Sequence, residues 1–168
     1  MSDATRLRID TERSEVTLAA RSSVHPIIAS ARPKGWFEGV VDGEFSAHGL
    51  MHGRIEIPVE DLSSGNPLID RETRRRIDAT VYPMIVGELT DVVDAGPLRV
   101  VVEGEVEFYG ESVLLEGELH LERSPENEPI IVGEGTVDVR WWGLNPPRLL
   151  VLKVDPEIEV SVRLVLVE

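Results

Sequence analysis

Apolar and polar residues alternate strictly over two long neighbouring segments of the chain. From Leu98 to Phe108 one set of alternate positions is apolar and the other is rich in glutamate, and residues 113–122 repeat this pattern after a turn at residues 109–112. Successive side chains of a β-strand point to opposite faces of its sheet. The two segments therefore predict a hairpin with one dry face and one solvated face.

Segments of the same kind recur along the rest of the chain and predict an all-β protein. They are joined by turns without a repeated strand–helix unit, which favours an antiparallel sandwich or barrel of about eight strands. A length of 168 residues is typical of one domain, so residues 1–168 are expected to form a single unit. The further strands are expected at residues 7–9, 15–20, 35–41, 44–49, 54–60, 82–93, 131–141 and 156–168.

Glycines at apolar-face positions favour the barrel over the sandwich. Glycine weakens a strand unless a sharp bend or a close approach needs the space. The glycines therefore indicate tight coiling of the sheet, room left for a ligand, or both, since an eight-stranded barrel is just wide enough for side chains or one small ligand. The positions concerned are Gly87, Gly104, Gly117, Gly133 and Gly135.

Residues 66–78 break the alternation and predict one short helix in a connection between strands. Asn66 is a suitable N-cap and Pro67 suits the first helical position. This segment is the only locally basic stretch of the chain, and we expect it to lie at the rim of the barrel. The two ion pairs expected at i,i+4 spacing are Asp70–Arg74 and Glu72–Arg76.

Composition narrows the function further. The formal net charge of -14 argues against nucleic acid as a partner, because a phosphate backbone would be repelled. The chain has no cysteine, which removes disulfides and thiolate chemistry. Hydrophobic residues make up 42% and aromatic residues only 5%, so the interior is expected to be aliphatic. No apolar N-terminal region or membrane-length run occurs, so we expect a cytoplasmic protein without stable membrane insertion.

Candidate catalytic and metal-binding groups are few. His48 and His52 are four residues apart, but they lie in a strand-and-turn context, so no metal site is predicted. His25 follows Ser22 and could form a dyad with it, although a loop histidine bonded to the backbone is the favoured interpretation. The glutamates alternate with apolar residues and are therefore expected on the solvated outer face. No catalytic residue and no cofactor is predicted.

Five short motifs occur in order along nearly the whole chain. Together they resemble the YceI-like family, although residues 74–80 lack the family's aromatic pair before Tyr82 and residues 145–148 alter the end of the last motif, which indicates a divergent branch. The motifs are Ile9-Asp10 with Ser14 and Val16; Gly43 and Phe45 with Gly49; Ser64-Gly65-Asn66 with Asp70 and Tyr82-Pro83; Gly104 to Gly110; and Val137 to Leu144 with Gly143.

The resemblance implies an extended lipocalin-like barrel and a non-enzymatic carrier of isoprenoid-type lipids, such as polyprenyl compounds or quinones. The residues agree with the hydrocarbon part of such a ligand, because an aliphatic lining without inward charge suits an apolar chain. The residues expected to contact it are Ile57, Leu68, Val102, Gly104, Val106, Phe108, Leu115, Gly117, Leu119, Val137 and Trp141.

The head group of such a ligand has candidate partners in the predicted helix. Arg71, Arg74 and Arg75 could hold an anionic head group, because guanidinium groups pair well with phosphate. Surface ion pairing with neighbouring acids, Asp70 and Glu72 among them, is the favoured alternative.

The adjacent Trp141 and Trp142 should face opposite ways on a strand. One would then plug the barrel or line the ligand, and the other would lie outside, where it could contribute to a homodimer. Two other functions stay open at this point. An isomerase or cyclase acting on an apolar substrate needs an ionisable group facing a cavity, and a dimeric interaction module would have an interior filled by its own side chains.

Overall fold

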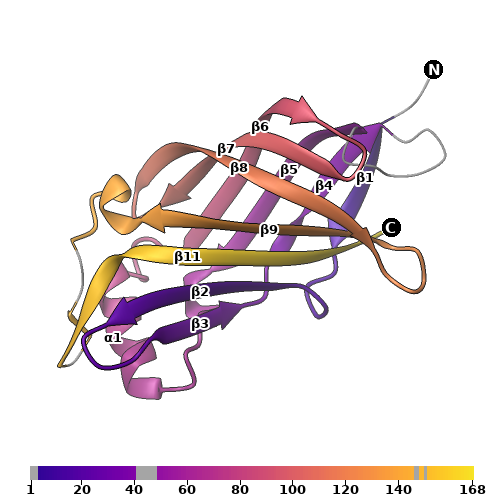
Figure 1. Cartoon of the computed structure of the whole chain (residues 1–168). Coiled ribbons are helices and arrows are strands. Elements are labelled where there is room, and N and C mark those ends of the chain that lie inside the picture. The colour runs from indigo at the N-terminus through magenta and orange to yellow at the C-terminus, as the bar shows by residue number, and fades with distance from the viewer. Residues whose placement is uncertain (1–3, 41–48, 146–147, 150) are drawn as a thin grey trace.

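The structure, a computed structural model, describes residues 4–40, 49–145, 148–149 and 151–168 (Figure 1). In the described residues, the helix α1 (Pro67–Ile77) and the 3-10 turns η2 (Val59–Asp61) and η3 (Val139–Trp142) accompany the strands. The strands are β1 (Ala4–Ile9), β2 (Glu15–Ser22), β3 (Ile27–Ala31), β4 (Lys34–Val40), β5 (Leu50–Pro58), β6 (Met84–Ala95), β7 (Arg99–Phe108), β8 (Glu111–Arg123), β9 (Pro129–Asp138), β10 (Arg148–Leu149) and β11 (Leu152–Val167).

Eight antiparallel strands form a closed barrel in the order β1-β4-β5-β6-β7-β8-β9-β11. The ring closes where β1 pairs with the last residues of β11, Arg8 opposite Val167 and Ile9 opposite Leu166. Along the rest of its length β11 pairs instead with β2, and β2 pairs with β3, so this hairpin widens the sheet at the other end. The prediction of an all-β, eight-stranded antiparallel barrel with one helix is confirmed.

The clearest differences between predicted and observed strands concern β3 and the end of β9; the short β10 was not predicted either, and one predicted strand cannot be compared. β3 was not predicted, because its sequence Ile-Ile-Ala-Ser-Ala lacks a clear polar alternation. The strand predicted to run to Trp141 stops at Asp138, whose carboxylate accepts a hydrogen bond from the Arg140 backbone N–H and so begins η3. The strand expected at residues 44–49 lies largely outside the described residues.

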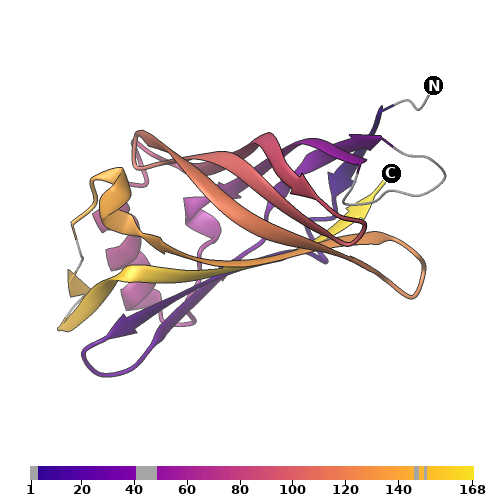
Figure 2. The same ribbon diagram turned by 45° about the horizontal axis from the view of Figure 1, so that its top comes forward.

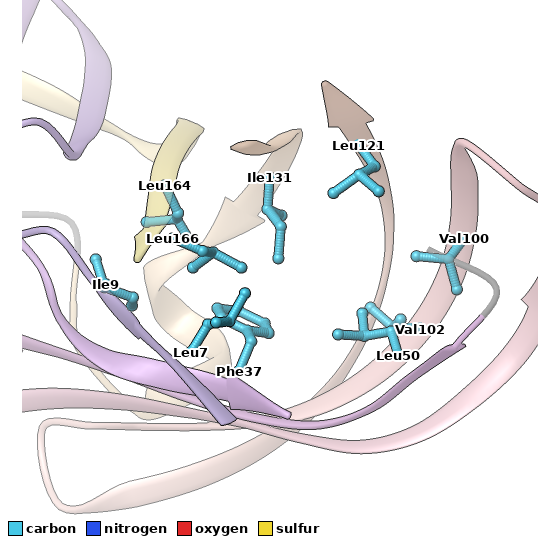
Figure 3. Packing of buried hydrophobic residues seen from close by; sticks show 10 residues of the cluster. All are labelled: Leu7, Ile9, Phe37, Leu50, Val100, Val102, Leu121, Ile131, Leu164 and Leu166. Atoms are coloured by element: carbon cyan, nitrogen blue, oxygen red, sulfur yellow. The ribbon is translucent and has the colours of Figure 1, made fainter. Parts of the chain in front are cut away.

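A dense apolar core closes the barrel at the end where β1 meets the last residues of β11 (Figure 3). Its residues come from seven strands, and Leu166 is 0% exposed. Figure 3 shows the side chains pointing toward one another. We call this cluster the closed-end core. It consists of Leu7, Ile9, Phe37, Leu50, Val100, Val102, Leu121, Ile131, Leu164 and Leu166.

Polar contacts reinforce the turns at this closed end. The hydroxyl of Ser14, a buried residue, accepts a hydrogen bond from the Val165 backbone N–H at 2.9 Å. Arg13 donates to the carboxylates of Asp10 at 2.8 Å and Glu128 at 2.7 Å, and these hydrogen bonds lower the pKa of both acids. The first family-like motif therefore ties the β1–β2 turn to the last strand and to the β8–β9 hairpin.

Helix α1 lies at the opposite end of the barrel (Figures 1 and 2). The Asn66 side chain accepts from two backbone N–H groups of the first turn, as predicted, and Ile69 and Ile77 are buried against the barrel. The predicted Glu72–Arg76 ion pair forms at 3.4 Å. The predicted Asp70–Arg74 pair is not among the ion pairs of the described residues, because Asp70 instead accepts hydrogen bonds from Ser64, through N–H at 2.8 Å and the hydroxyl at 2.6 Å.

Candidate ligand-binding cavity

An apolar cavity of about 670 Å³ fills the barrel between the closed-end core and α1. Inward side chains of the barrel strands and of β2 and β3, mostly valine, leucine and isoleucine, form most of its wall. Some charged residues of the outer face, such as Arg54, Glu88 and Glu134, also border it. The aliphatic residues of the chain therefore line the inside of the barrel, as the alternation along the strands predicts. Because the interior contains this cavity, the alternative prediction of a barrel filled by its own side chains is wrong.

Ten of the eleven residues predicted to contact a ligand lie on the cavity wall. Leu68 is not part of the wall that the described residues form, and it is 61% exposed. It follows Pro67 in the first turn of α1, where the next residue, Ile69, faces the barrel instead. Contact of the ten with a ligand stays a prediction. They are Ile57, Val102, Gly104, Val106, Phe108, Leu115, Gly117, Leu119, Val137 and Trp141.

The inward glycines have two different roles. Among the described residues, no atom lies within 4 Å of the place where a Cβ on Gly117 or Gly135 would sit, so these two leave open space in the cavity. A Cβ on Gly104 would lie 3.1 Å from the Glu88 carbonyl oxygen, and one on Gly133 would lie 2.8 Å from a Leu119 methyl group. Some glycines therefore leave room for a ligand and others allow neighbouring atoms to approach closely, so both roles expected from the sequence occur.

The two tryptophans stand at one end of the cavity, in η3 rather than on a strand. Trp142 is 3% exposed, its indole N–H donates to the Val106 carbonyl at 2.9 Å, and its ring meets that of Phe108 edge-on. Trp141 is 52% exposed, and both rings contribute to the wall. The strand geometry used to predict opposite orientations was wrong, yet one tryptophan is buried and the other exposed. Trp142 was not among the predicted ligand residues, although its neighbour was.

Polar groups reach the cavity from α1. Thr73 and Arg76 lie on the wall, following Ile69 at the i+4 and i+7 positions of the same helix face. Arg71, Arg74 and Arg75 are not part of the wall formed by the described residues. Helical spacing from Ile69 would have singled out Arg76 instead.

The other polar contacts of this helix lie within it and at the barrel end. Inside the helix, Arg75 donates to Glu72 at 3.1 Å, and Arg74 donates to the Glu60 carbonyl of η2 at 3.4 Å. The carboxylate of Asp70, which is 8% exposed and lies on the wall, is occupied by its hydrogen bonds from Ser64. Asp70, a buried acid on the wall, therefore orders the loop before α1.

None of the histidines in the described part of the chain belongs to the cavity wall. The His25 ring nitrogen Nδ1 lies 3.0 Å from the Pro26 carbonyl, and the Ser22 hydroxyl contacts the His25 backbone rather than its ring. His52 is exposed, and His48 lies outside the described residues. In the part of the chain that the structure describes, no three metal-ligating side chains come together. Likewise, none of the helices in that part is long and apolar enough to cross a membrane.

The fold and its cavity define a closed antiparallel barrel of the lipocalin-like class. The chain belongs to the YceI-like family, because the YceI-like domain matches residues 7–166. No curated protein matches the sequence.

Solved structures of similar fold have low sequence identity to this chain. BcnA of Burkholderia cenocepacia has a TM-score of 0.78 at 15% identity, covering 94% of this chain and 98% of its own. A polyisoprenoid-binding domain from Saccharophagus degradans, implicated in plant cell wall breakdown, has a TM-score of 0.74 at 11% identity over 95% and 97%. The YceI protein of Campylobacter jejuni has a TM-score of 0.54 at 12% identity over 76% and 80%.

Proposed function

We propose that this protein is a non-enzymatic carrier that encloses the hydrocarbon chain of an isoprenoid-type lipid, polyprenyl or quinone-like, in its barrel. The observation that carries the proposal is the aliphatic cavity of about 670 Å³. That volume lies within the range of about 300–1,000 Å³ typical of sites that enclose a small molecule. The wall residues Gly117 and Gly135 leave room for a ligand that larger residues would fill.

The chemistry of the wall favours a hydrocarbon over a polar ligand. Each methylene group moved from water into such a wall contributes about 0.8 kcal/mol, whereas a polar group without a partner there would lose its hydrogen bonds to water. The polyisoprenoid-binding domain from Saccharophagus degradans, which has the same fold, supports an isoprenoid as the class of ligand.

The head group would lie at the α1 end of the cavity. Arg71, Arg74 and Arg75 stay the predicted partners of an anionic head group, and we add Arg76, the arginine of α1 that lies on the wall. A homodimer that uses the exposed part of Trp141 also stays a prediction.

A fluorescence titration with all-trans-retinol, an isoprenoid alcohol, tests the proposal. Gly117→Phe places a ring in the open space of the cavity, and we expect it to weaken retinol binding at least tenfold without loss of stability. Ser161→Phe, on the exposed face of β11, is the matched control and should bind as the unmodified protein does. Failure of the unmodified protein to take up retinol in a saturable way would contradict the proposal, and so would equal binding by Gly117→Phe.

A further inference from the structure

The barrel wall is incompletely paired between β8 and β9. On its other side β8 pairs with β7 over ten positions, and β9 pairs with β11 over nine. Between β8 and β9, both fully described, only five pairs form, from Leu119 opposite Gly133 to Arg123 opposite Pro129. Figures 1 and 2 show the two strands diverging from their shared hairpin toward the α1 end.

The residues at the point where the ladder stops contribute little to pairing. Continued in the same register, the next pair would place Glu118 opposite Glu134, and like charges directly opposite each other weaken a sheet, although the Glu103–Glu116 pair of β7 and β8 does form. The following pair would be Gly117 opposite Gly135, which offers no side chains to pack. Two successive positions thus disfavour pairing, whereas the formed ladder includes Leu121 opposite Ile131, both buried in the closed-end core.

The cavity extends into this gap. Its wall includes consecutive residues of both strands, from Leu114 to Leu119 on β8 and from Gly133 to Val137 on β9. The paired strands β5 and β6 supply only three consecutive wall residues each, so the longer runs on β8 and β9, with the open space at Gly117 and Gly135, place the cavity at the gap. The gap ends at η3, where the Trp142 indole bonds to the Val106 carbonyl.

The two ends of the barrel are poorer routes into the cavity. The closed-end core fills one end with buried side chains. At the other end, Ile69 and Ile77 of α1 are buried, and the Ser30–Ser63 bridge ties β3 to the segment before the helix. A chain that entered there would displace these contacts, whereas passage between β8 and β9 breaks no pair of the ladders that form.

We propose that the gap between β8 and β9 is a lateral portal through which an apolar chain enters and leaves the cavity. This inference rests on the proposed carrier function and adds the route to it. The portal opens along the side of the barrel, so a chain longer than the cavity can extend through it into another apolar environment.

Crosslinking across the gap tests the portal, because the chain contains no native cysteine. Cysteines at Glu118→Cys and Glu134→Cys would flank the gap, and a short bifunctional maleimide would join them. The matched control, Thr17→Cys with Ser161→Cys, joins two directly opposed residues of the paired strands β2 and β11. Stopped-flow fluorescence then measures retinol entry and release before and after linking, and circular dichroism checks that each variant is folded.

We expect linking at the gap to slow entry and release of retinol at least tenfold while the equilibrium affinity changes little. The linked control should keep the rates of the unlinked protein. Unchanged rates in the gap-linked protein, with retinol still bound, would overturn the portal and leave the carrier function standing. If no variant and no unmodified protein bound retinol, both proposals would fall.

Discussion

The two halves of the barrel are built from the same kind of alternating strand and yet differ in how they use their inward positions. At the closed end the inward residues are large, and they meet in a core whose members are all buried. Toward α1 the corresponding positions of β8 and β9 include Gly117 and Gly135, which leave a cavity, and the ladder between the two strands stops. The first half therefore supplies stability, and the second gives up packing and pairing for internal space.

We expect a leucine-to-alanine substitution to lower the stability by different amounts in the two halves. Leu166→Ala should lower the free energy of unfolding by about 2–5 kcal/mol, because it empties a fully packed site. Leu115→Ala should lower it by about 1 kcal/mol or less, because its side chain already borders open space. Urea unfolding of both variants measures the difference, and equal losses would contradict the division into a packed half and an open half.

A second prediction concerns the polar tie at the closed end. Ser14→Ala removes the acceptor for the Val165 backbone N–H and should cost about 1–3 kcal/mol, because that buried donor is left unpaired. Hydrogen exchange of the Val165 amide should rise with it. A thermal midpoint unchanged from the unmodified protein would show that this contact does not hold the closed end together.

The cap of α1 offers a smaller change at the cavity end. Asn66→Ala removes the acceptor for the backbone N–H groups of Leu68 and Ile69 and should cost about 1 kcal/mol. Because α1 covers only the wide end, amide exchange should increase within the helix and stay unchanged in the closed-end core. Increased exchange throughout the barrel would show that the two halves unfold as one unit.

The smallest effect expected is a pH dependence at the closed end. Hydrogen bonds from Arg13 lower the pKa of Asp10 and Glu128 below their ordinary values of 3.8 and 4.5. The folded protein then binds fewer protons than the unfolded chain in this range, so the stabilisation is complete above about pH 4.5 and is lost as the pH falls through the lower folded values.

Arg13→Gln removes the cause of both shifts. Its thermal midpoint should therefore fall less between pH 7 and pH 3 than that of the unmodified protein. The effect should be modest and weaken with added salt, because these groups are partly exposed. An identical fall of the thermal midpoint in the two proteins would show that these pKa shifts do not contribute to the pH dependence of stability.

Strand alternation was enough to predict the barrel and most of its lining. Val102, Val106 and Leu115 face inward because period-2 side-chain direction is a local property of the backbone. The helix was likewise predictable from Asn66 and Pro67, which act within one turn.

Features that depend on distant partners were not predictable in the same way. Asp70 bonds to Ser64 rather than Arg74 because the loop before α1 folds back onto the helix. Trp142 turns inward because η3 replaces the end of a strand and its indole finds the Val106 carbonyl on β7. The role of each glycine could be assigned only once the register of the neighbouring strands was known. Gly104 and Gly117 both lie at apolar-face positions of the sequence, but only Gly104 has a neighbouring carbonyl oxygen close to the position of a Cβ.

Native mass spectrometry after incubation with geranylgeraniol, an isoprenoid alcohol, shows whether the barrel cavity holds a lipid. We expect one lipid bound per chain in the unmodified protein and in Ser161→Phe, and none in Gly117→Phe, whose added ring occupies the cavity. Equal lipid binding by Gly117→Phe, or no bound lipid in the unmodified protein, would contradict the claim that the barrel cavity is the binding site.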